Sequence, residues 1–353
     1  MSISFAARRA ACYNYLDRQK IYGELPEKLL PWYDAEKRDL PWRADTDPYR
    51  VWISEIMLQQ TRVEAAREHY LRFMRELPDV QALAACPEDR LMKLWEGLGY
   101  YSRARNLQKA ARQIVETGGF PADYEGLLKL SGVGQYTAGA IASIAFSQPV
   151  PAVDGNVIRV LSRIFADERP PETLKKVFTD ELGTNYPKTR CGDFTQSLME
   201  LGATVCLPRS PKCLFCPVFG LCGTRSDRLP LMPEKRPRKR ADMTVFIFST
   251  PRGIGLCRRK EGVLKGMWQF YNTERKMTAA EAAEFLKTLG IADAETGRAH
   301  FHKHIFTHIE WAMTAYVVRT ATLLPELSYF PAEEIGEKIA LPSAFRWCMD
   351  LLP

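Results

Sequence analysis

A chain of 353 residues with 46% hydrophobic content is long and apolar enough for two domains that each bury a core. The net charge of +7 is moderate, because 42 acidic residues oppose 49 basic ones, so charge alone does not identify a binding partner. The longest apolar run, at 138–146, is far too short to cross a bilayer, and no signal-type apolar core follows Arg8 and Arg9, so we expect a soluble, cytoplasmic protein.

The first predicted elements are two helices with a break between them. Residues 3–37 alternate apolar and charged positions with helical spacing, and Leu40-Pro41-Trp42-Arg43 interrupts that pattern. The next helix, Tyr49–Thr61, places Glu55 among large apolar side chains. A mid-helix glutamate usually faces water, but apolar neighbours raise the pKa of a carboxyl group toward neutrality, where it can act as a general acid near pH 7.

Residues 67–129 are predicted to be helical, with turns at proline and glycine positions. Within them, Gly99–Asn106 combines two tyrosines with two arginines at a helix start. Nucleic-acid-binding surfaces use such pairs for base stacking and phosphate contact, although paired tyrosines are more often core residues.

The segment Leu130–Arg163 carries the strongest functional signal. Gly132-Val133-Gly134 predicts a turn with uncovered backbone in front of an apolar helix, and bare amide groups at a helix N-terminus attract phosphate. Val153-Asp154-Gly155-Asn156 predicts an acidic cap before a second helix. Either piece alone could be only a turn or only a cap, but together they place a phosphate-binding hairpin close to a carboxylate.

These motifs resemble the helix-hairpin-helix DNA glycosylase superfamily, and within it the MutY-type adenine DNA glycosylases. The likeness extends from Leu40 to Trp311 at least. It implies a multi-domain fold whose all-α N-terminal part forms a six-helix barrel module and an iron–sulfur module. It also implies a monomer that binds double-stranded DNA with A:8-oxoguanine or A:G mispairs and bends it in the cleft between the modules.

The resemblance assigns the catalytic residues. Glu55 would protonate adenine at N7, and Asp154, ionised near its reference pKa of about 3.9, would stabilise the oxocarbenium-like sugar or bond to C1′ for part of the cycle. In relatives of the endonuclease III type, the residue that follows the equivalent of Gln135 is a lysine. This lysine forms a Schiff base, which leads to strand cleavage. This chain has Tyr136 there, so plain hydrolysis is expected, with Tyr136 and Asn156 holding the two carboxylates and the water.

The resemblance also implies which residues bind DNA. Those expected around the extruded adenine or in the base stack are Arg38, Leu40, Trp42, Arg43, Gln60, Tyr100 and Gln196. A tryptophan face with arginine donors suits a flat heterocycle with ring nitrogens. The backbone of Gly132, Val133 and Gly134 and the side chains of Arg209 and Lys212 are expected to bind phosphates.

Four of the nine cysteines lie close together, with the spacing C-x6-C-x2-C-x5-C. The odd total and the crowding favour a metal site in a reducing compartment over a disulfide framework. The spacing alone allows either a zinc ion held by four thiolates or a [4Fe–4S] cluster. The resemblance to the family's iron–sulfur loop favours a [4Fe–4S] cluster bound by Cys206, Cys213, Cys216 and Cys222.

The composition changes after the cysteines. Prolines and basic residues predict a stiff linker at 225–241 between a catalytic region at 1–224 and a second domain at 242–353. In that domain we expect strands at 244–249, 255–258 and 312–318 and one helix at 279–289, which make it an α+β domain. It resembles the Nudix-like domain of the MutY family but lacks the glutamate-rich box that binds magnesium, so hydrolysis of nucleoside diphosphates is not expected.

Four of the five histidines fall at 300–308. Alternate residues of one strand present a row of side chains rather than a closed cage, which gives a metal site there little support. In the family, a Phe-Ser-His hairpin probes 8-oxoguanine. The resemblance gives this role to Phe306, Thr307 and His308, where threonine keeps the hydroxyl and adds a methyl group.

The sequence therefore predicts a monofunctional adenine DNA glycosylase of base-excision repair, associated with the nucleoid through DNA binding. One alternative is an oxidised-pyrimidine glycosylase with lyase activity, which Tyr136 disfavours. Another is a DNA-damage binding protein without turnover, which the presence of both Glu55 and Asp154 argues against.

Overall fold

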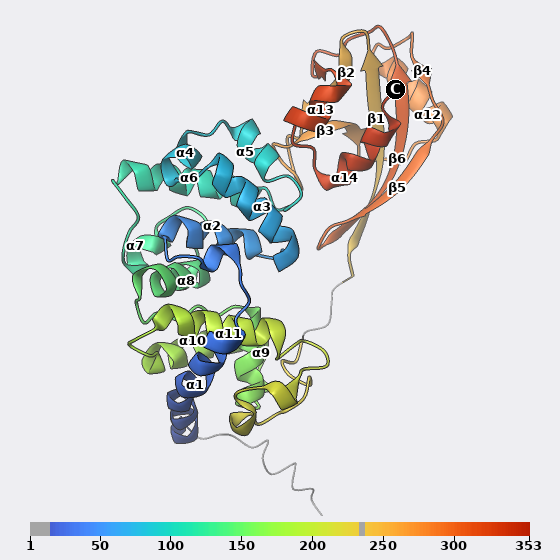
Figure 1. The fold of residues 1–353 in the computed structure, drawn as a ribbon. Coiled ribbons are helices and arrows are strands. Elements are labelled where there is room, and N and C mark those ends of the chain that lie inside the picture. The colour runs from blue at the N-terminus through green and yellow to red at the C-terminus, as the bar shows by residue number, and fades with distance from the viewer. Residues whose placement is uncertain (1–14, 233–236) are drawn as a thin grey trace, which may run out of the picture. The chain divides into compact units, whose positions relative to one another are not determined.

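The computed structural model of the chain describes residues 15–232 and 237–353 (Figure 1). The chain divides into two compact units, which are described separately: Met1–Ala84 with Asn106–Glu234, and Ala85–Arg105 with Lys235–Pro353. The first is helical and the second is built on a β-sheet, so the predicted fold class is confirmed. Across the described residues, no helix combines the length and the apolar character that a membrane span needs.

The first unit consists of helices joined by short turns. They are α1 (Tyr15–Glu36), α2 (Pro48–Leu58), α3 (Val63–Glu76), α4 (Val80–Ala85), most of α6 (Ser102–Glu116), α7 (Tyr124–Leu128), α8 (Gln135–Phe146), α9 (Gly155–Ile164), α10 (Pro171–Asn185) and α11 (Cys191–Thr204), with the 3-10 turns η1 (Pro41–Arg43), η2 (Cys213–Phe215) and η3 (Phe219–Leu221). The helical pattern predicted from residue 3 is confirmed from Tyr15 onward, and its beginning lies outside the described residues.

Helix α8 positions the elements around it. It packs against α2, α7 and α11, and the side chains from Thr137 to Ile144 are buried, as expected for a helix that is apolar all round. Small residues allow the close packing: a Cβ atom on Gly139 would lie 2.2 Å from the Pro151 carbonyl oxygen, and one on Gly192 of α11 would lie 2.8 Å from the Ile144 Cα atom. As a result, α2, α8 and α11 bring their polar side chains together.

The predicted hairpin lies between α7 and α8. Gly132 has a φ of 76°, and a Cβ atom there would lie 2.6 Å from the Asn106 Cβ atom, so the position requires glycine. Gly134 has an extended backbone and caps α8. Both glycines are exposed, which leaves their backbone uncovered in front of the helix.

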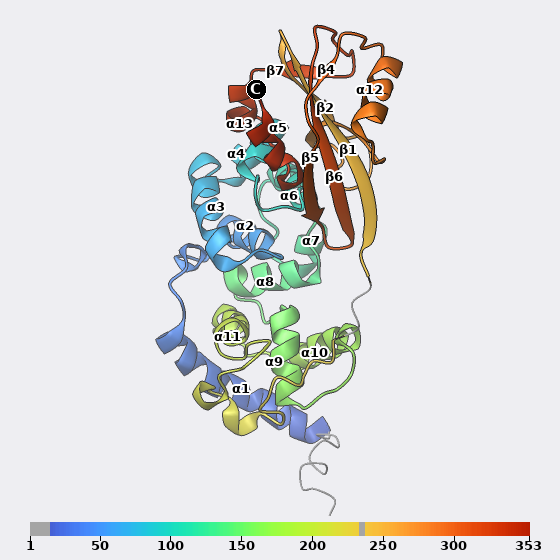
Figure 2. The same cartoon turned by 90° about the vertical axis from the view of Figure 1, so that its right-hand side faces the viewer.

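The second unit contains a seven-stranded sheet. Its strands are β1 (Lys239–Thr250), β2 (Gly253–Arg258), β3 (Trp268–Thr273), β4 (Glu295–Thr296), β5 (His300–Ile305), β6 (Ile309–Arg319) and β7 (Ser328–Phe330), in the order β4-β6-β1-β3-β2-β7 with β5 also paired to β6. β1 and β6 run parallel and the other pairs are antiparallel. β5 and β6 form a hairpin beside β1, which Figure 2 shows from the side.

Helices cover both faces of this sheet. Helix α12 (Ala279–Thr288) packs on one face, and α13 (Ala332–Lys338), α14 (Ser343–Arg346) and the 3-10 turn η4 (Trp347–Leu351) pack on the other (Figure 1). The expectation of a single helix in this region is wrong. The additional helices have 7 and 4 residues, which is too short for a helical pattern to show in the sequence.

Two further details of the second unit differ from the sequence prediction. β1 begins at Lys239, inside the predicted linker, because Lys239–Ser249 pairs with Ile309–Arg319 of β6. The segment Ala85–Arg105, which contains α5 (Glu88–Leu94), belongs to this unit. It is held there by Lys93, whose ammonium group donates to the carbonyl oxygens of Gly336 and Ile339 at 2.7 and 3.2 Å.

Candidate active site

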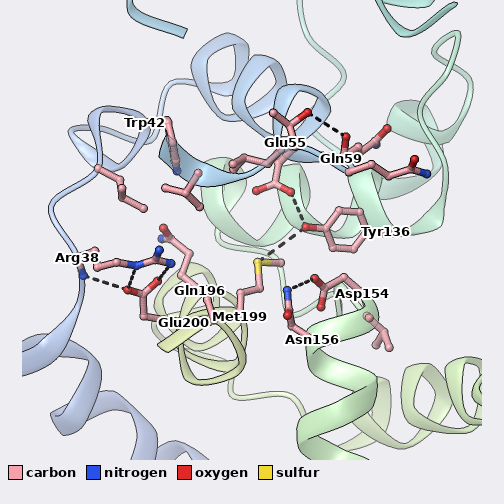
Figure 3. A pocket seen from close by; sticks show the side chains of 18 of the residues that line it. Arg38, Trp42, Glu55, Gln59, Tyr136, Asp154, Asn156, Gln196, Met199 and Glu200 are labelled. Carbon is pink, nitrogen blue, oxygen red and sulfur yellow. Dashed lines mark hydrogen bonds and ion pairs between the residues drawn. The ribbon is translucent and has the colours of Figure 1, made fainter. Parts of the chain in front are cut away.

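A pocket of about 730 Å³ in the first unit contains most of the predicted catalytic and base-binding residues (Figure 3). Turn η1 and helices α2, α8, α9 and α11 contribute its walls. The predicted residues that line it are Arg38, Leu40, Trp42, Arg43, Glu55, Gln60, Tyr136, Asp154, Asn156 and Gln196. Side chains that the sequence places more than 150 positions apart therefore meet in one site.

Glu55 extends from α2 into this pocket and is only 7% exposed. Its Oε2 atom accepts a hydrogen bond of 2.6 Å from the Tyr136 hydroxyl. Burial raises the pKa of Glu55 to about 7; the Tyr136 hydrogen bond opposes this rise, and the negative charge of Asp154 adds to it. The expectation of a carboxyl group with a near-neutral pKa is therefore supported, and Glu55 can be protonated or ionised at physiological pH.

Asp154 caps α9. Its Oδ1 atom accepts from the Val157 backbone amide and its Oδ2 atom from the Asn156 side chain, both at 2.8 Å. The expectation that its pKa stays near the ordinary value differs from the structure, because burial raises this pKa and the hydrogen bonds from Val157 and Asn156 only partly oppose the rise. The acceptor positions of both oxygens are fixed, so the carboxylate has a defined orientation at the pocket wall.

Tyr136 lies between the two carboxyl groups. It is near the start of α8, and besides its bond to Glu55 its hydroxyl approaches the Met199 sulfur atom at 3.9 Å. Burial and the neighbouring charges of Glu55 and Asp154 raise its pKa well above the ordinary value. The phenol therefore stays protonated and acts as a hydrogen-bond donor.

Glu200 is a site residue that the sequence reasoning missed. Its carboxylate is fully buried and accepts from Arg38 at 2.6 and 2.9 Å and from Arg43 at 2.7 Å. Burial alone would raise its pKa, but these hydrogen bonds hold it at about 2. Glu200 is thus a permanent anion that orients two guanidinium groups. Its sequence signal is the one that identified Glu55, a glutamate in an otherwise apolar helical run.

Trp42 and Gln60 line the same pocket, where Trp42 is notable for its packing and Gln60 for its backbone conformation. Trp42 is only 8% exposed and packs edge-to-face against Tyr70, with ring centroids 5.5 Å apart. Gln60 has a φ of 59°, an uncommon conformation for a non-glycine residue that is often found at functional sites.

The residues expected to read the opposite base lie in the second unit. Phe306, Thr307 and His308 form the turn between β5 and β6, closed by a 2.8 Å hydrogen bond from the Phe306 amide to the Ile309 carbonyl oxygen. Tyr100 is 47% exposed, with a φ of 46°. Its hydroxyl lies 2.6 Å from the Thr307 hydroxyl oxygen. The structure thus joins the predicted wedge residue to the predicted lesion-reading turn.

The four clustered cysteines surround a small common cavity, next to Arg163 of α9. The Arg163 guanidinium donates to the Cys206 sulfur atom at 3.3 Å and to the Leu207 carbonyl oxygen at 2.7 Å. Elsewhere on α9, Arg159 donates to the Asn156 side-chain oxygen and the Cys206 carbonyl oxygen, both at 2.8 Å. One helix therefore connects the capping carboxylate Asp154 with the cysteine loop.

Two further observations concern metal and phosphate binding. Within residues 15–232 and 237–353, no three His, Cys, Asp or Glu side chains are grouped so that they could hold a single metal ion between them, although the four cysteines border one cavity. Arg209 and Lys212, on the loop between the first two cysteines, are exposed, as are the hairpin residues Gly132 and Gly134, whereas Val133 is buried. The expected phosphate contacts are thus open to water, apart from the Val133 side chain.

Both parts of the chain are similar to known proteins. Residues 53–181 match the HhH-GPD superfamily of base excision DNA repair proteins, and residues 244–351 match the NUDIX domain. A thermostable thymine-DNA glycosylase of known structure is similar over 59% of this chain and 96% of its own, with 29% identity and a TM-score of 0.52.

Curated relatives extend the likeness to nearly the whole chain. The adenine DNA glycosylase of Mus musculus is 50% identical over 207 residues, 55% of this chain, and the chain spans only 40% of that relative's length. The adenine DNA glycosylase of Buchnera aphidicola subsp. Schizaphis graminum is 32% identical over 328 residues, which are 89% of this chain and 90% of the relative. The chain belongs to the adenine DNA glycosylase family.

Proposed function

We propose that this protein hydrolyses the N-glycosidic bond of adenine mispaired with 8-oxoguanine or guanine in double-stranded DNA. The observation that carries the proposal is the pocket in which Glu55, with a pKa of about 7, faces the fixed carboxylate of Asp154. An acid and an anion on either side of a sugar–base bond are the groups that this hydrolysis requires. Family membership supports adenine as the base that leaves.

In the proposed mechanism, adenine is extruded from the duplex into the pocket. Glu55, held by Tyr136, gives its proton to the base while the bond from C1′ to the base breaks and its electron pair leaves with adenine. Asp154 stabilises the positive charge that develops on the sugar. Water then adds to C1′ and loses a proton to the ionised Glu55, which restores the starting state. Tyr136 stands where a lyase would carry a lysine nucleophile, so no strand cleavage follows.

Arg38 and Arg43 are proposed to bind the edge of the extruded adenine. Ion pairs with Glu200 already orient both guanidinium groups, so these groups need little reorganisation when the base binds. Gln196 lines the same part of the pocket and adds an amide donor and acceptor. Gln60 is proposed to enter the base stack, and its uncommon backbone conformation supports this proposal.

The cysteines are proposed to hold a [4Fe–4S] cluster. Cys206, Cys213, Cys216 and Cys222 line one cavity. The Arg163 guanidinium donates to the Cys206 sulfur atom and the Arg225 amide to the Cys222 sulfur atom, which suits thiolate ligands. When bound, the cluster would tie the loop together and take no part in the hydrolysis. Arg209 and Lys212 on that loop, with the hairpin at 132–134, would bind phosphates.

The turn at 306–308 is proposed to recognise 8-oxoguanine opposite the adenine. In this base N7 carries a hydrogen, so the N7–H group can donate a hydrogen bond to the Thr307 hydroxyl oxygen. Tyr100 would insert beside the lesion. Its contact with the Thr307 hydroxyl would bring both residues to the same base. We also infer that the protein acts as a monomer in the cytoplasm, on the DNA of the nucleoid.

An incision assay on the full chain tests the proposal. Duplexes with A:8-oxoguanine and A:G should be cut only after alkali treatment, which breaks the strand at the abasic site that the enzyme leaves. Strand cleavage without alkali, together with borohydride trapping, would instead identify an oxidised-pyrimidine glycosylase with lyase activity. Binding without any excision would identify a damage-binding protein.

A further inference from the structure

Arg259 is a buried cation that the proposed function does not use. It follows β2, and its side chain is only 11% exposed. Its guanidinium donates to the side-chain oxygens of Gln269 and Asn272 at 3.1 and 3.2 Å and to the exposed Glu274 at 3.4 Å. Its Nε atom is buried without a hydrogen-bond partner. An apolar residue would avoid the loss of hydration that this arrangement entails.

The buried guanidinium group of Arg259 has a favourable partner in the ring of Trp311, which belongs to β6. The guanidinium carbon lies 5.0 Å from the centroid of the Trp311 ring, a cation–π contact that favours one orientation of the indole. Trp311 is fully buried, so the contact is shielded from water, where such an interaction is strongest. Arg259 itself is fixed by two backbone hydrogen bonds of 2.9 and 2.7 Å, from its own amide to the Met267 carbonyl oxygen and from the Gly266 amide to its carbonyl oxygen.

The same indole ring supports the lesion-reading turn. Phe306 packs edge-to-face against Trp311 with ring centroids 4.7 Å apart, and edge-to-face against His304 with ring centroids 4.6 Å apart. Phe306 directly precedes Thr307, the residue whose hydroxyl contacts Tyr100. The contacts therefore run without interruption from Arg259 through Trp311 and Phe306 to the hydroxyl of Thr307.

We propose that Arg259 is a positioning residue for recognition of the base opposite adenine. By fixing the Trp311 ring it fixes Phe306, and with it the place of the Thr307 hydroxyl. A hydrogen bond tells 8-oxoguanine from guanine only if its acceptor is held in place, since a loose hydroxyl can turn to suit either base. This inference rests on the proposed lesion-reading role of the turn.

Arg259→Met tests it, because methionine keeps much of the side-chain volume and removes the cation from the Trp311 ring. We expect the preference for A:8-oxoguanine over A:G to fall about three- to tenfold. The loss should come from weaker binding of the A:8-oxoguanine duplex. The single-turnover rate at saturating enzyme should stay within about twofold of the parent, since Arg259 touches no reacting group. Arg259→Lys, which keeps a cation near the ring, should retain most of the preference.

Two controls separate positioning from general damage. Arg319→Met removes one positive charge from the other end of β6 and should leave the preference unchanged. In a Phe306→Leu background, Arg259→Met should have no further effect on the preference, as the double-mutant cycle requires if Arg259 acts through Phe306. If Arg259→Met does not fold, Arg259→Gln replaces it, because it also removes the cation and leaves a polar amide in the same environment.

The outcomes distinguish this inference from the proposed function. Unchanged preference in Arg259→Met, or in Arg259→Gln where that variant replaces it, would overturn the role of Arg259 and leave the proposed function standing. A loss that persists in the Phe306→Leu background would do the same. A parent protein that excises adenine equally well opposite guanine and 8-oxoguanine would overturn the lesion-reading role of the turn, and the inference with it.

Discussion

Replacing Glu55 with glutamine should make the folded protein more stable while it stops base excision. Burial raises the pKa of Glu55 from its ordinary 4.5 to about 7, so at higher pH the folded protein must keep a carboxylate away from water. Glutamine has the same shape without the charge, and its amide oxygen can still accept the hydrogen bond that Tyr136 donates at 2.6 Å.

The size of the effect follows from the pKa difference. Between pH 4.5 and 7 the folded state holds a proton that the unfolded chain has released, so the free energy of unfolding of the parent falls as the pH rises through this window. At about 1.4 kcal/mol for each pH unit, the loss is about 3 kcal/mol above pH 7 and about 1 kcal/mol at pH 5. Glu55→Gln avoids this loss, so its gain in stability should follow the same curve.

Urea denaturation of the full chain, followed by circular dichroism at pH 5 and pH 8, measures this difference. Glu68→Gln, at an exposed position of α3, is the matched control and should change stability by no more than about 0.5 kcal/mol at either pH. A variant that is destabilised equally at both values, or stabilised by the same amount at both, would show that Glu55 does not carry a raised pKa in the folded protein. Glu55 would then be ionised at pH 7 and could not serve as the general acid.

Three other changes and one property of the purified protein test the proposed function. Asp154→Asn should nearly abolish excision while binding to the mispair stays within about tenfold of the parent, because the carboxylate acts on a charge that exists only in the transition state; retained single-turnover excision would remove Asp154 from the mechanism. Thr307→Val should weaken the preference for A:8-oxoguanine over A:G by about ten- to a hundredfold with little change in the saturating rate, and a variant that discriminates as well as the parent would place lesion reading elsewhere. Glu200→Gln should slow excision about ten- to a hundredfold, since a neutral amide cannot hold two guanidinium groups. Single-turnover kinetics on A:8-oxoguanine measure this rate, and an unchanged rate would contradict the role of Glu200. Purified protein should be yellow-brown from thiolate-to-iron charge transfer, and active, colourless protein that contains zinc would contradict the cluster.

The parts of the site that sequence alone could predict depend on local signals. A glutamate in an apolar helix, an aspartate in front of a helix and a glycine turn each have a physical meaning within a few residues of chain. The structure places Glu55, Asp154 and Gly132 as those signals imply. The burial that raises the Asp154 pKa depends on the packed helices around it, and the sequence does not show that packing.

Interactions between distant parts of the chain could not be predicted in this way. Glu200 meets Arg38 across 162 positions, and Tyr100 meets Thr307 across 207. Such pairs form only when the helices and strands between them pack.

Asp154 has two roles, since the proposed catalytic carboxylate is also the N-cap of α9. Asparagine caps a helix about as well as aspartate does, and a single base change in the codon exchanges one for the other. Under the proposed function, that change would yield an abundant, folded protein that finds the mispair and leaves it unrepaired. In a cell that makes both forms, the inactive copies would shield lesions from the active ones, so the mutation would behave as dominant rather than as a simple loss.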